Sequence, residues 1–299
     1  MSRQDTKLSQ KGEKVAADAA IMPRPEIAHT SVREVLSEVE RVTSAVQAST
    51  GWSIDLNQVQ FGVVSAGELA RRYVVDSERL TGVPFAPPTT TAGRDAFNAM
   101  KDSRFGNTVA LFVRCERAIL FNEELVSKVS KDTVRSSLFH ELVHVAQWQR
   151  YPDFCIATDA LVREAICMSQ HGGDVPKDER ARSLLVAQDR MQARKALLEG
   201  YAAVLQAEYI QTNDLHPSKH VNFFEVVIGE AALLTAGSAT KIAQFVAGAL
   251  LMRELRDRNA EVIEALFQNP DLVDVVFGSK NPVSTKDSPA RVRDSRTSA

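Results

Sequence analysis

Two histidines stand four residues apart, with a glutamate directly after the first, in the stretch FHELVHVAQ. On an α-helix, residues i and i+4 share one face, so His140 and His144 can both present a ring nitrogen to one tetrahedral metal ion. Glu141 is turned by about 100° from His140, which places its carboxylate beside such an ion rather than on it. The spacing therefore predicts a zinc site in which Glu141 takes a proton from zinc-bound water.

The segment 130–150 has the periodicity of the helix that must position these residues, with Asp132 as the expected N-cap and Pro152 beyond the end. A polar or small stripe runs through Ser137, His140, His144 and Gln147, and a separate apolar stripe through Val134, Leu138, Leu142 and Val145. One stripe can anchor the helix while the other lines a cleft. The competing interpretation is an ordinary buried helix with two hydrogen-bonded histidines.

A catalytic zinc ion usually has three protein ligands and one open position, so a third ligand is needed. Residues 147–154 contain neither glycine nor histidine, which excludes the H-x-x-G-x-x-H continuation of metzincins. Further along, Glu199 lies in the helical segment ARKALLEGYAAVLQAEY, and its neighbours Ala196, Gly200, Ala202 and Ala203 are small. Small neighbours allow the close helix approach that a ligand needs. The alternative is a surface glutamate on a helix that packs through its alanines.

The pair HELVH and LLEGYA resembles the gluzincin metallopeptidases, in which a glutamate from a second helix completes the zinc site. A family of poorly characterised bacterial zincin-like proteins is similar over about residues 105–277. Its HEL-x-HA-x-Q resembles residues 140–147, its AL-x-EG-x-A resembles 196–202, and its late motifs resemble Phe245, Val246 and VIEALFQNP. The resemblance implies zinc ligands His140, His144 and Glu199, the general base Glu141, and hydrolysis of a peptide or protein substrate.

The chain also departs from these families. Thermolysin-like gluzincins place an aspartate four residues after the ligand glutamate to orient a ligand histidine, where this chain has Ala203. An oxyanion stabiliser is also needed, and the candidates are Tyr151, His216 and His220. These departures favour a second interpretation, a zincin-fold binding or scaffold protein that retains a metal site without efficient hydrolysis. A third is a helical interaction protein without metal.

The predicted elements are helix 30–49, strand 59–63 with Val59, Phe61 and Val63 inward, helix 65–75, loop 82–93 and a hairpin over 107–122 that turns near 115–117. Helices 153–172, 177–210 and 222–277 follow, the last interrupted at Asn269 and Pro270. This order predicts an α+β, zincin-like fold.

We expect disordered tails 1–26 and 279–299, a catalytic domain 27–215, and a helical part 216–278 closing the cleft. By resemblance, strand 118–121 is a candidate edge strand for substrate, although an ordinary sheet strand fits equally well.

Composition excludes some partners. Lys and Arg total 36 against 38 Asp and Glu, a net charge of -2, which provides no electrostatic reason to expect nucleic acid or an anionic membrane. The apolar stretch 221–252 is interrupted by Glu225, Glu230 and Lys241, which favours core helices over stable membrane insertion. Three cysteines without C-x-x-C spacing and a charged N-terminus predict a cytoplasmic protein.

Overall fold

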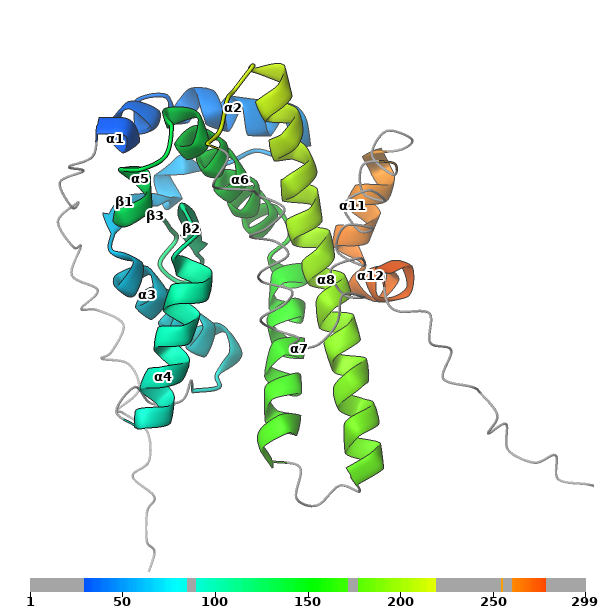
Figure 1. Ribbon diagram of the computed structural model, residues 1–299. Coiled ribbons are helices and arrows are strands. Elements are labelled where there is room, and N and C mark those ends of the chain that lie inside the picture. Colours follow the sequence, from blue (N-terminus) through cyan, green and yellow to red (C-terminus); the bar gives the residue numbers. More distant parts are fainter. Residues whose placement is uncertain (1–29, 85–89, 172–176, 219–253, 255–259, 278–299) are drawn as a thin grey trace, which may run out of the picture. The chain divides into compact units, whose positions relative to one another are not determined.

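The computed structural model describes residues 30–84, 90–171, 177–218, 254 and 260–277, and these residues have an α+β architecture (Figure 1). They are mostly helical, with one three-stranded mixed sheet. The predictions for the tails, for 221–252, and for His220, Phe245 and Val246 lie outside the described residues. In the described ranges, no helix has the length and apolar character needed to cross a membrane.

The described residues fall into two compact units. Unit 1 contains those up to Pro152 and those from Ala202 to Ser218, and unit 2 contains those of Asp153–Tyr201 together with the C-terminal helices. The long helix α8 (Lys177–Thr212) contributes its first part to unit 2 and its last part to unit 1. The expected division between a catalytic domain 27–215 and a helical part 216–278 stays a prediction.

Unit 1 begins with two helices, α1 (Thr30–Leu36) and α2 (Val39–Thr50), where the sequence predicts a single helix. The backbone leaves the helical conformation at Glu38, which has φ −104° and ψ 8°. The Glu38 carboxylate pairs with Lys131 at 3.1 Å and with Arg135 at 2.9 Å. Both cations lie far away in the sequence, so hydrophobic periodicity alone does not show this bend.

The sheet has the strand order β1-β3-β2, with β1 (Gln60–Val64), β3 (Ala118–Asn122) and β2 (Ala110–Val113). β1 runs parallel to β3 and β2 runs antiparallel to it, so Ile119 has Phe61 on one side and Phe112 on the other. All five residues of β3 are buried, as expected for a central strand. The candidate edge strand 118–121 is therefore central, and within the described part of the chain β2 is an edge strand.

The hairpin between β2 and β3 forms where the sequence predicts it. Arg117 has a positive φ of 50° in the turn, and the Cys115 N–H donates to the Asp76 carboxylate at 2.7 Å. The inward pattern predicted for β1 is wrong in part, because Gly62 is buried while Phe61 and Val63 are only half-buried.

Helix α3 (Ala66–Thr81) starts as predicted, since the Ser65 hydroxyl accepts the Glu68 N–H at 3.2 Å. The predicted loop 82–93 ends early, because Thr90 caps helix α4 (Thr91–Met100) by accepting the Gly93 N–H. A π-helical turn, η2 (Lys101–Phe105), follows, and a short 3-10 turn, η1 (Leu56–Gln58), precedes β1. Phe105 is fully buried in the core between α3 and the sheet.

After the short helix α5 (Glu123–Val126), helix α6 (Lys131–Arg150) carries the H-E-x-x-H motif. Its N-cap is Ser130, whose hydroxyl accepts the Thr133 N–H at 3.2 Å, and not Asp132 as predicted. Asp132 lies in the first turn, where its carboxylate accepts the His216 N–H and pairs with Arg135. The apolar stripe predicted on this helix is confirmed, since all four of its residues are fully buried.

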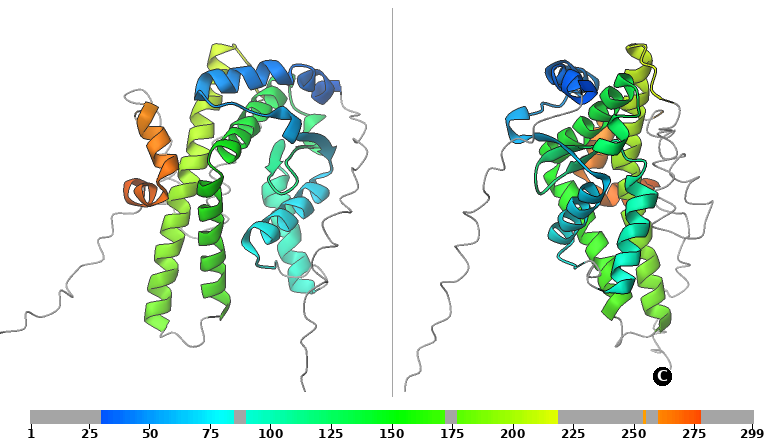
Figure 2. Two further views of the ribbon diagram at one scale, coloured as in Figure 1. Left: turned by 180° about the vertical axis from the view of Figure 1, so that it is seen from behind. Right: turned by 60° about the vertical axis from the view of Figure 1, so that its left-hand side comes forward.

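Unit 2 contains α7 (Pro152–His171), the first part of α8, α11 (Ala260–Gln268) and α12 (Pro270–Phe277). Both views of Figure 2 show α7 and α8 side by side. Phe267 of α11 packs edge-on against Phe154 and Tyr201, with ring centroids 5.3 Å and 5.8 Å away. The helix break at Asn269 and Pro270 is confirmed.

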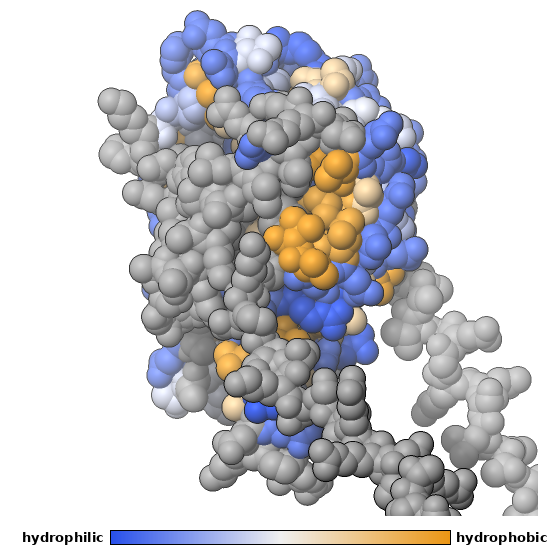
Figure 3. All heavy atoms as spheres, turned by 90° about the vertical axis from the view of Figure 1, so that its right-hand side faces the viewer, coloured by the Kyte–Doolittle hydropathy of each residue, from blue (hydrophilic) through white to orange (hydrophobic). Residues whose placement is uncertain are grey.

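The surface also carries apolar side chains, which Figure 3 shows gathered in one area of the face it views. Among the residues that the structure describes, the exposed large apolar side chains are Ile156, Leu185, Val186, Leu272, Val275 and Val276. All of them belong to helices of unit 2.

Candidate metal centre

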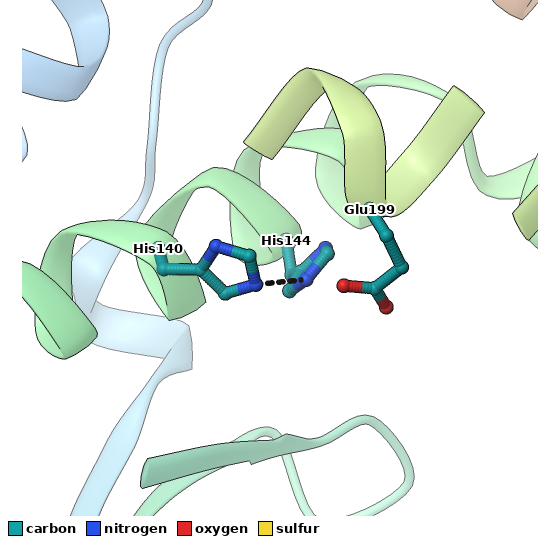
Figure 4. A group of neighbouring side chains, drawn as sticks. All are labelled: His140, His144 and Glu199. Atoms are coloured by element: carbon teal, nitrogen blue, oxygen red, sulfur yellow. Dashed lines mark hydrogen bonds between the residues drawn. The ribbon is translucent and has the colours of Figure 1, made fainter. Parts of the chain in front are cut away.

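The structure brings the three predicted ligands together. One ligand atom each from His140, His144 and Glu199 lies within 4.8 Å of the others. Figure 4 shows the two rings from α6 and the carboxylate from α8 converging on one point. His140 is buried and the other two are half-buried, so the group is shielded and still reachable from solvent. Such a group could hold a metal ion.

The two imidazole rings are arranged as ligands of one ion would be. Nε2 of His140 and Nε2 of His144 are 3.0 Å apart, and the ring planes meet at 86°. Two nitrogens bound tetrahedrally at the usual zinc distance would be about 3.3 Å apart, close to this separation. Two imidazole nitrogens and one carboxylate oxygen are a donor set of catalytic zinc sites, so the residues present fit that ion.

Two contacts set the register between α6 and the C-terminal part of α8, both within unit 1. The Gln206 side-chain amide donates to the Ser136 carbonyl at 2.8 Å, and the rings of Phe139 and Tyr209 stack at 4.2 Å. Ser136 precedes His140 by one turn, and Gln206 follows Glu199 by about two turns. The continuous helix therefore carries Glu199 to the level of the histidines.

Ala202 lies between Glu199 and Gln206 on α8 and is fully buried. Its methyl group adds little bulk to the helix surface, which agrees with the small residues that the sequence places around Glu199. A large side chain at this position would have to displace its neighbours, because protein interiors are close-packed.

The Glu141 carboxylate contacts the sheet. Its Oε2 accepts the Phe112 backbone N–H at 2.8 Å, and the side chain is buried. The Asn122 N–H donates to the Val109 carbonyl, so these two residues form a hydrogen-bonded pair beside the β2–β3 ladder. Hydrogen-bonded and non-hydrogen-bonded pairs alternate along an antiparallel ladder. Phe112, three residues after Val109, therefore belongs to a non-hydrogen-bonded pair, and its N–H points away from β3 toward the open edge. The general base predicted from the sequence thus lies at the open edge of β2.

Trp148 lies on the same face of α6 as Glu141, two turns further along. Its ring packs against Phe112 at 6.0 Å, and the Arg117 guanidinium lies over it at 5.4 Å. The contacts with β2 and the β2–β3 turn show a packing role.

Two of the predicted oxyanion candidates are engaged elsewhere. Tyr151 is buried edge-on against Trp52, with ring centroids 5.1 Å apart, about two helical turns beyond His144. His216 has a side chain that is 81% exposed, and its Nε2 is 3.7 Å from the Asp214 carboxylate. His216 is not part of the group formed by the three ligand residues.

Sequence reasoning missed two contacts of the site. Nδ1 of His144 is 2.8 Å from Oε1 of Gln147, whose side chain is 1% exposed. The i, i+3 spacing and the polar stripe could have indicated this pair. No sequence pattern marks the hydrogen bond from the Phe112 N–H to Glu141, because every residue except proline carries a backbone N–H donor.

Comparisons of the chain with protein-family models, with curated proteins and with solved structures found no match.

Proposed function

We propose that the protein is a zinc-dependent metallopeptidase of the gluzincin type with a zincin-like fold. His140, His144 and Glu199 bind the ion, and Glu141 is the general base. The observation that carries the proposal is the convergence of three ligand atoms within 4.8 Å, from residues that the motif had already singled out. The adjacent Glu141 supplies a carboxylate that the ligand group does not use.

The chain's residues divide the work of peptide hydrolysis. Zinc, when bound, lowers the pKa of a water molecule and polarises a carbonyl group. Glu141 accepts the proton from that water and passes it to the leaving amine. The Phe112 N–H, 2.8 Å from Oε2, holds this carboxylate at the edge of the sheet.

A second candidate function is a zincin-fold binding or scaffold protein that retains the metal site without efficient hydrolysis. The observation that favours it concerns the oxyanion. Tyr151 packs on Trp52, and His216 is exposed near Asp214, so neither of these contacts places a donor at the ligand group. Hydrolysis without such a donor is typically slower by about 10²- to 10³-fold.

Digestion of a peptide library by zinc-loaded protein, with and without a chelator, separates the two functions. The peptidase cleaves peptides, stops when the metal is removed, and loses about 10²- to 10⁴-fold in rate in Glu141→Gln, because an amide cannot take the proton. Zinc binding without cleavage supports the scaffold. Undiminished cleavage by a zinc-loaded Glu141→Gln variant would refute the peptidase mechanism.

A further inference from the structure

The contact between Gln147 and His144 is built into the interior of α6. Gln147 follows His144 by three residues, so the two side chains share one face of the helix. The Gln147 side chain is 1% exposed, which restricts its rotamers, and its Oε1 lies 2.8 Å from Nδ1 of His144. The same imidazole presents Nε2 to His140 at 3.0 Å. One ring thus has a fixed partner at each nitrogen.

The chemistry of the amide oxygen decides which nitrogen of His144 carries the proton. A neutral imidazole has one N–H, and an amide oxygen can only accept a hydrogen bond. Nδ1 must therefore donate to Gln147, which leaves the lone pair on Nε2, the atom directed at the ligand group. A metal ligand needs this lone pair, and fixing the tautomer in advance removes a cost of binding.

We propose that Gln147 is the positioning residue that orients His144 for metal binding. This inference rests on the proposed function. In thermolysin-like gluzincins, the aspartate that orients a ligand histidine comes four residues after the ligand glutamate, and this chain has Ala203 there. Here α6, the helix that carries both histidines, itself supplies the acceptor, which is the Gln147 amide oxygen. The partner is a neutral amide rather than a carboxylate, so the site gains orientation without a further negative charge.

Two substitutions separate the acceptor oxygen from the volume of the side chain. Gln147→Met keeps the length and removes the amide oxygen, whereas Gln147→Glu keeps an acceptor at the same reach. We expect Gln147→Met to raise the zinc dissociation constant, measured by competition with a chelator, by about 10- to 100-fold. Gln147→Glu retains wild-type affinity or exceeds it.

Gln149 provides the matched control on the same helix. Its side-chain amide makes two hydrogen bonds with the Asp55 backbone, at 2.9 Å and 3.1 Å, away from the ligand group. Gln149→Met therefore removes a similar set of contacts from α6. We expect it to leave the zinc dissociation constant unchanged.

Long-range ¹H–¹⁵N NMR of the His144 ring provides a readout independent of any variant. The proposal predicts the Nδ1–H tautomer in the wild type, both metal-free and zinc-loaded. A dominant Nε2–H tautomer in the metal-free protein would overturn it, even if Gln147→Met failed to fold. If the wild type binds zinc and Gln147→Met binds it equally well, this inference is overturned and the proposed function is not. A wild type that binds no zinc would overturn the proposed function and this inference with it.

Discussion

The side chain of Gln206 donates a hydrogen bond to the backbone carbonyl of Ser136, 2.8 Å away, and so ties α8 to α6 one turn before the first histidine. The stacked rings of Phe139 and Tyr209 support the same register. Helices α6 and α8 are distant along the chain, and these contacts hold them so that together they carry the ligands of one site. The register is therefore part of the metal centre.

Gln206→Met tests this link. The substitution removes a buried hydrogen bond, so we expect a loss of about 1 to 2 kcal/mol in the free energy of unfolding. Zinc affinity should fall with it, because Glu199 is positioned through the same helix. Urea denaturation and chelator competition measure the two effects. Gln211→Met, at an exposed position of α8, is the control. A stability loss with unchanged zinc affinity would show that this contact does not position Glu199.

Ala202→Leu tests the close approach of the helices. Ala202 is fully buried, so the added atoms must force neighbouring groups apart, at a cost of about 1 to 3 kcal/mol. We expect the zinc dissociation constant to rise as the ligand geometry is disturbed. Ala207→Leu places the same change at an exposed site of the helix and should alter neither stability nor zinc affinity. Equal behaviour of the two variants would contradict the packing described for α8.

Arg194 and Asp274 form a buried ion pair in unit 2. The two groups are 2.8 Å apart, and their side chains are only 4% and 10% exposed. Asp274→Asn removes the nearer, buried carboxylate and leaves the Arg194 guanidinium with the exposed Asp271 carboxylate at 3.6 Å, so we expect a loss of about 3 kcal/mol in unfolding free energy. Asp271→Asn removes a carboxylate that is 84% exposed and should cost less than about 1 kcal/mol. A similar cost for both, measured by urea denaturation, would contradict this account.

Glu68 predicts a pH dependence of stability. Hydrogen bonding to Arg71, with further help from Arg72, lowers its pKa from 4.5 to about 2 against the opposing effect of burial. A carboxyl group with a depressed folded-state pKa contributes stability above its unfolded value, and this contribution is lost as the pH falls through the folded value. Wild type should therefore exceed Glu68→Gln by about 1 kcal/mol at pH 7, a difference that fades between pH 4.5 and pH 2. A constant difference from pH 7 to pH 2, measured by urea denaturation, would show that the pKa is not depressed.

The parts of the site that local spacing encodes could be predicted from the sequence. His140 and His144 share a helical face because of their separation, and small residues around Glu199 indicate close packing. The structure places all three together. These features depend on neighbours within one or two helical turns, where periodicity is informative.

Contacts between distant segments could not be predicted in the same way. The bend at Glu38 is held by Lys131 and Arg135, which lie on another helix. The central position of β3 depends on which strands pair, and the strands' own residues do not state their order. The bond from Phe112 to Glu141 uses a backbone donor, so no side-chain pattern marks it.

The zinc content of the purified, metal-equilibrated protein tests whether His140, His144 and Glu199 bind zinc. Elemental analysis of the wild type beside His144→Ala and Glu199→Ala, each checked for folding by circular dichroism, measures it. We expect about one zinc ion per wild-type chain, as for a three-ligand site, and a large loss of zinc in both variants. Wild-type protein without zinc, or folded variants that keep a full equivalent, would contradict this expectation.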